Sequence, residues 1–391
     1  MSSDRQSFLP PFSLADALRA GLAAADRASF YRTPFYRQHG AAFDEWVTTI
    51  RSGGPHVDTP PSDPRRLRLV HWNIEQGKAW DRIVQAIGSD PRLQRADLWS
   101  LNEVDIGAAR SGNRDVIGDL AGLLGLHWVF VPSYLEVTKR LRDDRLAPGE
   151  NAVGLHGTAL LSRWPLIDPG TTPLPDCFDC FRFPKEKRYG SRRLLWATVR
   201  HPRGDFRLAT AHLEVRASPR CRTRQMAAAL ASLPDGPCFF AGDWNTHTFR
   251  RGGFLQTAQE FLRLQSTKPD EIDRQLVETW EREPLFGHLQ ERGFAFRPWN
   301  DTSPTVREAL AGVDELALIP APVRPWVTRQ LKLTTRILRM RLDWIAARGP
   351  WIPVPDAPAP AAWTATDLGP EGLAASDHAP IGVEAVWPES V

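Results

Sequence analysis

Short apolar runs that alternate with polar positions recur along most of this chain, and several of them end in an acid, an amide or a histidine. Two clear runs cover residues 67–75 and 96–103. A third rises through Phe239 and Phe240 and stops at Asp243 and Asn245. Alternation with a period of two predicts a β-strand, and a continuous apolar run bounded by turn signals predicts a buried strand. The sequence therefore predicts polar side chains at the rim of a buried sheet.

The same patterns predict the remaining elements of a mixed α/β chain. Further strands are predicted at residues 127–132, 157–165, 192–199, 206–213, 339–347 and 381–386, with a hairpin turn at His201–Gly204. Helical spacing predicts helices over residues 13–27, 80–87, 118–124, 220–233, 254–264 and 271–281. We find no internal repeat of solenoid period, so a repeat architecture is not expected.

The texture of the chain changes at two places, and this predicts its domain organisation. Residues 1–65 contain one helix capped by Ser13, then aromatic residues, then a linker rich in Gly, Pro and Ser. We interpret them as an N-terminal helical and linker extension whose aromatics pack on a main domain at 66–391. Residues 247–335 lack the strand rhythm and are interpreted as an insertion on the active-site side.

Composition indicates an ordinary globular protein. Of the 391 residues, 42% are hydrophobic and 24% are charged, which is enough apolar material for a large core. Only six of the 49 basic residues are Lys; the rest are Arg, which suits bidentate phosphate contacts but also reflects a GC-rich genome. No run of about 18 apolar residues and no apolar signal core occur, so a cytoplasmic protein without a membrane span is expected.

Four cysteines are too few for a disulfide-built scaffold. Cys177 and Cys180 have the CxxC spacing of a zinc site, but Cys221 and Cys238 do not form a second such pair. We therefore expect loop or core thiols at Cys177 and Cys180.

The polar residues at the strand ends form a set suited to phosphate chemistry. They are hard oxygen donors with two imidazoles and no thiolate, which favours Mg²⁺ or Mn²⁺ over zinc. If the strand continues beyond Asp243, Asn245 points to the same side and the two can hold one water or phosphate oxygen. Each residue alone has an ordinary structural explanation, as a turn, a cap or a core histidine. The set is Asn73, Glu75, Glu103, His212, Asp243, Asn245, Asp343, Asp377 and His378.

Seven short motifs in this order resemble the endonuclease/exonuclease/phosphatase superfamily, the family of deoxyribonuclease I, abasic-site endonucleases, inositol polyphosphate 5-phosphatases and neutral sphingomyelinases. The resemblance spans roughly residues 66–388, and the joint order is far more specific than any one motif. It implies a four-layered α/β sandwich in which two mixed β-sheets pack face to face with helices outside. The motifs are Trp72–Glu75, Leu101–Glu103, Ala159–Pro165, His212–Leu213, Gly242–Asn245, Leu342–Ile345 and Ser376–His378.

The resemblance also implies the metal ligands of a Mg²⁺- or Mn²⁺-dependent hydrolase. Glu103 would be the principal ligand, assisted by Asn73 and Glu75. Asp377 would lie at or near a second metal position. Arg193, in an Arg-x-x-x-Ala-x-Val pattern, is at a position expected to contact phosphate.

The remaining residues have catalytic roles by the same resemblance. Asp243 would orient or deprotonate the attacking water, and Asn245 would hold that water or a phosphate oxygen. His378 would stabilise the transition state, with Asp343 accepting its other N–H and fixing the tautomer. His212 matches a second histidine that contacts phosphate or serves the leaving group in the deoxyribonuclease and sphingomyelinase branches.

The substrate is less well defined than the chemistry. The Pro-Ala-Trp-Cys-Asp-Arg run of the 5-phosphatases is absent, and the corresponding strand here is Met340-Arg-Leu-Asp343-Trp. This difference argues against the function of an inositol-phosphate phosphatase. We expect a nuclease acting on nucleic acid first and a sphingomyelinase-like lipid phosphodiesterase second, with an inactive metal- or phosphate-binding module outside this class. The basic apolar stretch 324–341 could follow a nucleic-acid backbone, rest on an anionic membrane surface or be a solvated helix face. Five tryptophans could stack bases, although core positions explain them as well: Trp128, Trp164, Trp244, Trp299 and Trp344.

Overall fold

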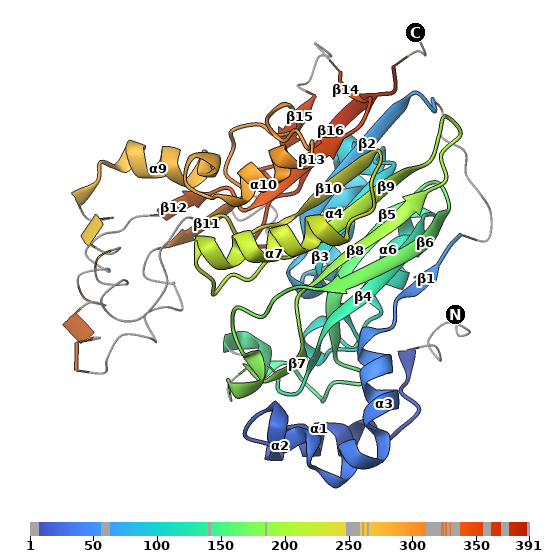
Figure 1. The fold of residues 1–391 in the computed structure, drawn as a ribbon, viewed down its shortest axis with the longest axis vertical. Helices are drawn as coiled ribbons and strands as arrows, with labels where there is room; N and C mark the ends of the chain where they lie inside the picture. The colour runs from blue at the N-terminus through green and yellow to red at the C-terminus, as the bar shows by residue number, and fades with distance from the viewer. Residues whose placement is uncertain are drawn as a thin grey trace.

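Two β-sheets pack face to face and helices cover their outer faces, so the chain forms the expected layered α/β sandwich (Figure 1). The two sheets hold nine and five strands, and a separate two-stranded sheet extends from them. The computed structural model describes residues 8–55, 63–139, 142–183, 186–247, 266–309, 337–354, 361–368 and 375–388, with a few isolated residues within 259–263 and 322–329.

The larger sheet contains nine strands and mixes parallel and antiparallel pairs. Its main path runs β1-β4-β5-β3-β2-β16-β14, with β7 beside β4 and β15 beside β16. Only β2 and β3 are parallel among these pairs. The strands are β1 Arg51–Gly53, β2 Arg66–Asn73, β3 Leu98–Ile106, β4 His127–Glu136, β5 Leu155–Ser162, β7 Arg188–Gly190, β14 Ile352–Pro353, β15 Ala362–Thr364 and β16 Ile381–Val386.

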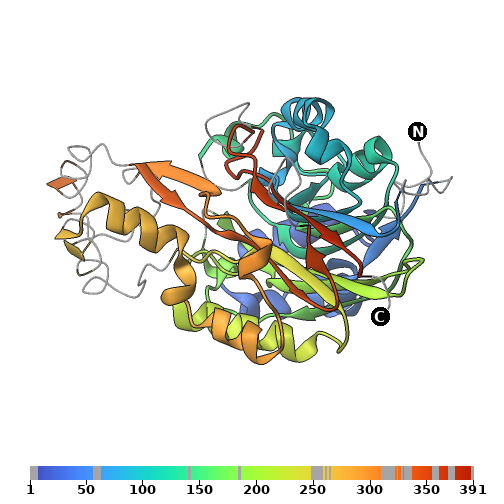
Figure 2. The same cartoon turned by 90° about the horizontal axis from the view of Figure 1, so that it is seen from above.

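The smaller sheet has five strands in the order β13-β10-β9-β8-β6. Within it β9 and β10 run parallel, and the other pairs are antiparallel. A separate pair, β11 with β12, forms an arm that extends from the sandwich in both views (Figures 1 and 2). The strands are β6 Leu166–Pro173, β8 Arg193–Val199, β9 Phe206–Ala211, β10 Cys238–Asp243, β11 Val306–Ala309, β12 Ile337–Met340 and β13 Asp343–Arg348.

Helices lie on both outer faces of the paired sheets (Figure 2). Within the described ranges, no helix is both long and apolar enough to cross a bilayer. The α-helices are α1 Leu14–Ala23, α2 Arg27–Tyr31, α3 Pro34–Thr48, α4 Trp80–Ser89, α5 Pro91–Gln94, α6 Val116–Leu124, α7 Pro219–Ser232, α9 Pro269–Val277 and α10 Leu285–Glu291. Single 3-10 turns are η2 Glu75–Gly77, η3 Ala109–Ser111, η4 Arg142–Leu146, η5 Cys180–Arg182, η7 Thr279–Glu281 and η8 Arg297–Trp299.

Three hydrophobic clusters fill the three spaces between the four layers. Strand β2 shows how alternation assigns side chains to them. Leu67 and Leu69 face the smaller sheet, whereas Val70 and Trp72 face the helices on the other side. The third cluster packs α7 and α10 against the smaller sheet. Burial on both faces explains why these strands are nearly continuous apolar runs.

The N-terminal helices pack against the larger sheet, as expected from their aromatic residues. Phe30, Phe43 and Trp46 are buried in the same cluster as the residues of α4 and α6. The Trp46 indole donates to the Phe8 carbonyl at 3.0 Å, and β1 extends the sheet through its pairing with β4. The extension and the sandwich therefore share one core, and the division into domains stays a prediction.

The sequence pattern identified most long strands but not the short or exposed ones. The predicted strands in the sandwich and the hairpin between β8 and β9 are confirmed, except that the single strand expected at 339–347 is two strands: β12 ends at Met340 in the separate pair, and β13 begins at Asp343 in the smaller sheet. Strand β6 was missed because it is a half-exposed edge strand that contains Pro169 and Pro173. The helix expected at 254–264 falls almost entirely outside the described residues, and the one expected at 271–281 is observed as α9 with η7.

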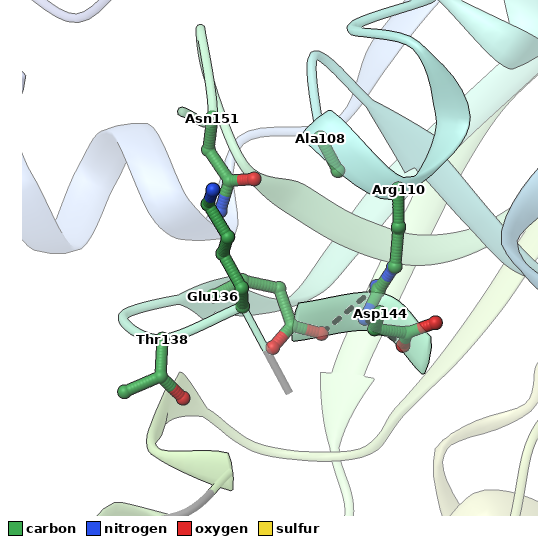
Figure 3. A pocket seen from close by; sticks show the side chains of 7 residues that line it. Ala108, Arg110, Glu136, Thr138, Asp144 and Asn151 are labelled. Atoms are coloured by element: carbon green, nitrogen blue, oxygen red, sulfur yellow. Dashed lines mark hydrogen bonds and ion pairs between the residues drawn. The ribbon is translucent and has the colours of Figure 1, made fainter. Parts of the chain in front are cut away.

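A buried cluster of charges lies near one end of the larger sheet (Figure 3). The Arg110 guanidinium contacts Asp105 at 2.6 and 2.8 Å and Glu136 at 3.0 Å. Its Nη1 lies 3.6 Å from Asp144 Oδ2. Burial opposes the charged form, but these carboxylates raise the pKa of Arg110 well above its ordinary value. The charged side chains of this cluster stay ionised and are held in place by one another. Several of them line a small pocket, which Lys139 also lines.

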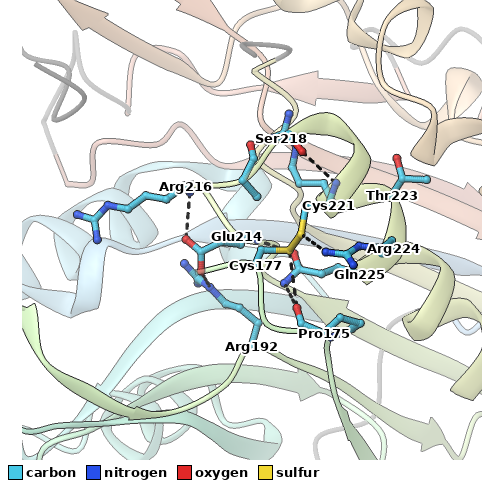
Figure 4. The surroundings of a disulfide bond; sticks show 12 residues. Pro175, Cys177, Arg192, Glu214, Arg216, Ser218, Cys221, Thr223, Arg224 and Gln225 are labelled. Atoms are coloured by element: carbon cyan, nitrogen blue, oxygen red, sulfur yellow. Dashed lines mark hydrogen bonds and ion pairs between the residues drawn. A yellow bond between two sulfur atoms is a disulfide. The ribbon is translucent and has the colours of Figure 1, made fainter. Parts of the chain in front are cut away.

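A disulfide joins Cys177 to Cys221 across a Cα–Cα distance of 6.1 Å (Figure 4). It ties the segment before η5 to the first turn of α7. The expectation of a thiol at Cys177 was therefore wrong, because the two cysteines meet only in the fold, 44 positions apart. Cys180 is a buried free thiol as expected, and Cys238 is another.

His201, in the turn between β8 and β9, is enclosed by aromatic rings. Its ring centroid is 4.4 Å from that of Trp164 and 5.2 Å from that of Trp387. The Arg203 backbone N–H donates to His201 Nδ1 at 3.2 Å, so this nitrogen is unprotonated. Burial, with a contribution from the Arg203 charge, lowers the pKa of His201 to about 4.

Removing the disulfide should lower stability without changing the fold. The double substitution Cys177→Ser/Cys221→Ser opens a loop that the disulfide closes over 44 positions. From the chain entropy of such a loop, we expect the free energy of unfolding to fall by about 4 kcal/mol. Urea titration of both proteins with and without a dithiol measures it. The wild type should lose stability on reduction and the double variant should not. Four reactive thiols in the denatured, unreduced wild type would contradict the bond.

His201 should make the chain less stable in acid. The unfolded state takes up a proton near pH 6.5 and the folded state only near pH 4, so stability falls as pH drops between these values, by up to roughly 3 kcal/mol. His201→Asn keeps an acceptor at the Nδ1 position but has no proton to bind. Urea midpoints at pH 7 and pH 4.5 should therefore diverge less in the variant than in the wild type. Parallel pH profiles for the two proteins would refute this assignment.

Candidate active site

Strand ends from both sheets bring polar residues to one end of the sandwich. The parallel register of β2 and β3 sets Asn73 beside Asn102, and the antiparallel register of β10 and β13 sets Asp243 beside Asp343. His212 follows β9, which runs parallel to β10, and therefore reaches the same edge. Each of these side chains is buried. Residues far apart in the sequence thus form one site, as expected.

The Asp243 carboxylate lies at the centre of this site. Asn73 Nδ2 donates to its Oδ2 at 3.1 Å, and the Nε2 atoms of His212 and His378 lie 3.3 and 3.8 Å from the same oxygen. The Asp243 backbone N–H donates to Asn102 Oδ1 at 2.8 Å. Asp243 is only 2% exposed. Three nitrogen groups therefore converge on one carboxylate oxygen at the strand edge.

Asp343 is buried between two histidines. His378 Nδ1 donates to its Oδ2 at 2.7 Å, and His71 Nε2 donates to its Oδ1 at 3.1 Å. His71 Nδ1 lies 2.9 Å from Ser100 Oγ. These contacts fix which ring nitrogens carry hydrogen and leave His378 Nε2 directed toward Asp243.

The charges of this group are coupled. Burial would raise the pKa of Asp343, but His378 and His71 lower it far below its ordinary value. Burial opposes protonation of His378, yet Asp343, Asp243 and Asp377 raise its pKa well above 6.5. An imidazolium facing Asp243 is the form that this surrounding stabilises.

Asn245 reaches the site by a different geometry from the one expected. Strand β10 ends at Asp243, and Asn245 has a left-handed backbone with φ of 50°. Its backbone N–H donates to Asp243 Oδ1 at 3.0 Å, and its Nδ2 donates to the Leu213 carbonyl at 3.0 Å. A tight turn rather than a continued strand therefore holds Asn245 beside Asp243.

The acids Glu75, Glu103 and Asp377 are called here the carboxylate rim of the site, and two of them lie on left-handed backbone. Glu103 has φ of 54° and sits at an irregularity in the pairing of β3 with β5, between Leu101 and Val104. Glu75 has φ of 44° and is followed by Gln76 at 63°. Non-glycine residues rarely adopt this conformation, and it occurs where the surrounding structure dictates a side-chain direction. A β-bulge redirects a side chain in the same way.

The rim acids influence one another. Glu75 Oε2 accepts from the Asp377 backbone N–H at 3.2 Å, and Glu75 Oε1 accepts from Lys78 Nζ at 2.9 Å. Asp377 reaches the surface, but neighbouring groups desolvate its carboxyl, which raises its pKa. The charges of Glu75 and Glu103 raise the pKa further, whereas the charge of His378 lowers it. The pKa of Asp377 is raised to about 7. Negative charge is thus concentrated at the rim.

His212 has a charged neighbourhood of its own. Arg192 Nε lies 3.4 Å from Glu214 Oε2, and both side chains are buried (Figure 4). Burial, with a contribution from Arg192, lowers the pKa of His212, while Asp243 opposes the shift. Glu214 in turn accepts from the Arg216 backbone N–H at 3.0 Å. His212 is therefore held in its neutral form next to a fixed cation.

The predicted phosphate contact Arg193 lies on β8, where its Nε donates to Thr171 Oγ1 on β6 at 3.0 Å. Its neighbour Arg192 acts electrostatically on His212 and Glu103. The sequence pattern could not separate these adjacent arginines, because the pattern does not show which one points to the site. The role of Arg193 stays a prediction.

Three residues of the site were missed. Asn102 bridges the sheets, since its Nδ2 donates to Thr158 Oγ1 at 2.7 Å and to Thr210 Oγ1 at 3.1 Å. His71 and Arg192 were also overlooked. Asn102 stands in the Leu101–Glu103 motif, so its position at the end of a strand was the available signal.

The donor set fits a hard divalent cation. Glu75, Glu103 and Asp377 supply carboxylate oxygens, Asn73 can add an amide oxygen, and no thiolate is near. Asp243, Asp343 and His378 also offer atoms within 4.8 Å of one another. In this second group both Asp343 oxygens already accept hydrogen bonds from buried histidines.

The described residues decide between some of the alternatives left open for the surface. All five tryptophans considered for base stacking are buried, which favours the core explanation over stacking. Arg341, at the end of the basic stretch, is buried and contacts Asp301 at 2.6 Å. Most of residues 324–336 lie outside the described part of the chain.

Similar solved structures include an endonuclease/exonuclease/phosphatase from Beutenbergia cavernae, at 20% identity and a TM-score of 0.49, covering 83% of this chain and 72% of that one. The human Nocturnin catalytic domain has 14% identity and a TM-score of 0.46, covering 88% and 98%. TDP2 from D. rerio has 18% identity and a TM-score of 0.41, covering 82% and 98%.

No curated protein sequence matches the chain. The model of the Endonuclease/Exonuclease/phosphatase family matches residues 70–378, which is most of the chain and includes every predicted site residue. The chain therefore belongs to the endonuclease/exonuclease/phosphatase family.

Proposed function

We propose that the chain is a divalent-metal-dependent phosphodiesterase that acts on nucleic acid, with a water oriented by Asp243 as nucleophile. One observation carries the proposal: the Asp343-bound His378 faces the Asp243 carboxylate across 3.8 Å, beside the carboxylate rim. A base, a cation for the developing oxyanion and a set of hard ligands thus share one sheet edge.

Asp243 orients the attacking water and takes its proton. Its Oδ2 accepts from Asn73, and its Oδ1 accepts from the Asn245 backbone N–H, so the carboxylate cannot rotate freely. A fixed acceptor is what in-line attack on phosphorus requires. Asn245 positions the same water or a phosphate oxygen from the adjoining turn.

His378 stabilises the negative charge that develops on the phosphoryl oxygens. Asp343 holds its Nδ1–H at 2.7 Å, and this leaves the Nε2–H to donate to the reacting group. Because the donor is fixed before the substrate arrives, little reorganisation is needed in the transition state. His71 keeps the second oxygen of Asp343 occupied.

Glu75, Glu103, Asp377 and Asn73 are the residues that would hold Mg²⁺ or Mn²⁺. When bound, such an ion supplies positive charge that offsets the charge of the phosphate. Glu103 and Glu75 are directed toward the rim by their left-handed backbone. On this reading, backbone strain is retained because it orients the ligands.

His212 and Arg192 serve the phosphate and the leaving oxygen. His212 is neutral beside Arg192, so its ring N–H can donate a hydrogen bond to the departing alkoxide as the phosphorus–oxygen bond breaks, and the alkoxide then takes its proton from solvent. The guanidinium of Arg192 has the shape to contact a phosphate oxygen while Glu214 holds it in place. A second histidine favours diester substrates over monoesters.

The disulfide bears on the compartment in which the chain works. A cytoplasmic location was expected by default, but structural disulfides persist in oxidising compartments and are rare in the cytosol. The bond therefore favours an oxidising compartment for this protein.

Asp243→Asn should reduce turnover by about 10²–10⁴, because the amide cannot accept the proton of the attacking water. The assay measures hydrolysis of single- and double-stranded DNA, RNA, sphingomyelin and inositol phosphates with Mg²⁺ or Mn²⁺. Asp235→Asn, on an exposed side chain, is the matched control. Equal activity of the Asp243 and Asp235 variants would exclude the proposed base, and cleavage of sphingomyelin alone would exclude the nucleic-acid substrate.

The adjacent arginines should differ in effect. Arg192→Lys should lower kcat/KM about ten- to hundredfold, because a charge-assisted bidentate contact is lost. Arg193→Lys should change it less than about threefold if its contact with Thr171 is structural. Steady-state kinetics on the preferred substrate of the wild type distinguishes the two, with thermal unfolding as a check of folding. The reverse order would restore Arg193 as the phosphate contact.

A further inference from the structure

Lys78 joins the carboxylate rim to the buried charge cluster. It follows the left-handed turn Glu75–Gly77, and its Nζ lies 2.9 Å from Glu75 Oε1. The same Nζ lies 3.1 Å from Asp144 Oδ1 on η4. The side chain is about one-third exposed, so the ammonium stands at the boundary between the rim and the interior. Lys78 therefore brings a positive charge into direct contact with a rim carboxylate.

Asp144 also contacts the buried charge cluster around Arg110 (Figure 3). Its Oδ2 lies 3.6 Å from Arg110 Nη1, and Arg110 is bound to Asp105 and Glu136. Asp144 is only 8% exposed, so loss of Lys78 would leave a nearly buried carboxylate with a weaker partner. The ammonium therefore has a fixed position and cannot leave Asp144 without cost.

Glu75 is correspondingly occupied at both oxygens. Lys78 takes Oε1, and the Asp377 backbone N–H takes Oε2. A divalent ion bound through Glu75 would share that carboxylate with the Lys78 ammonium. The two positive charges would then lie on the same carboxylate and repel each other strongly, because the site is partly shielded from water.

We propose that the Lys78 ammonium is a built-in cation on the Glu75 side of the rim, so that the site binds one divalent ion at a time. The inference rests on the proposed function, because it takes the rim acids as the metal ligands. Lys78 is then a positioning residue: it holds Glu75 and sets the number of ions, but it does not touch the reacting atoms. Mg²⁺ and Mn²⁺ complete their coordination with water, so one ion does not need every rim acid.

The test counts Mn²⁺ ions bound to the full chain without substrate, from the electron paramagnetic resonance signal of free Mn²⁺ and by calorimetry. The wild type should bind one ion. Lys78→Met should bind a second, at least tenfold more tightly than any further binding by the wild type. Lys78→Arg, which keeps the charge, should return to one.

Lys139→Met is the matched control. Lys139 lines the pocket beside Arg110 and Asp144, and its Nζ pairs with Glu150 at 3.3 Å rather than with Glu75, so its variant should bind one ion. Thermal unfolding checks that each variant is folded. Two ions on the wild type, or one ion on Lys78→Met, would overturn the proposal but leave the proposed function standing. No Mn²⁺ bound by the wild type would refute the metal dependence itself and this inference with it.

Discussion

The buried Asp343 carboxylate joins the two sheets at the end where the candidate site lies. It belongs to β13 of the smaller sheet, whereas its partner His71 lies on β2 of the larger sheet and its partner His378 lies in the segment just before β16 of that sheet. A buried carboxylate without partners would cost several kcal/mol, so the two sheets are stable in this arrangement only when both histidines reach it. The same contacts aim His378 at Asp243. One interaction therefore both aligns the layers and orients a catalytic imidazole.

Backbone strain is concentrated where the chemistry is expected. Glu75, Glu103 and Asn245 are three of six non-glycine residues with positive φ among the described residues. Hydrogen bonds hold two of these turns: Asn73 Oδ1 accepts from the Glu75 backbone N–H at 3.1 Å, and Asp243 accepts from Asn245. The rigid strands on either side allow such conformations to persist, because β2, β3 and β10 are paired on both edges. The fold thus sets side-chain directions that the local sequence would not prefer.

Two sets of contacts connect the candidate site to the rest of the fold. In the first, ion pairs from Lys78 through Asp144 to Arg110 connect the rim to a buried charge cluster. In the second, the Cys177–Cys221 bond anchors α7, and Gln225 of that helix accepts from the Glu214 backbone N–H at 2.9 Å. Glu214 then contacts Arg192 beside His212. Groups that do not react can thus hold in place those that do.

The sequence by itself indicated buried strands, because long apolar runs such as 239–242 can be satisfied only by burial on both faces, and it identified the polar strand ends because the polar residues interrupt that pattern. The layered sandwich was implied by the resemblance of the seven motifs to a known family. Tertiary structure alone decided what those ends contact. The pairing of Cys177 with Cys221, the choice between Arg192 and Arg193, and the roles of His71 and Asn102 depend on partners 22 to 272 positions away. The left-handed turn at Asn245 could not be predicted from the sequence either, because the alternating pattern predicts that the strand continues past Asp243. Local patterns report burial, whereas direction and partnership arise only when distant strands meet in register.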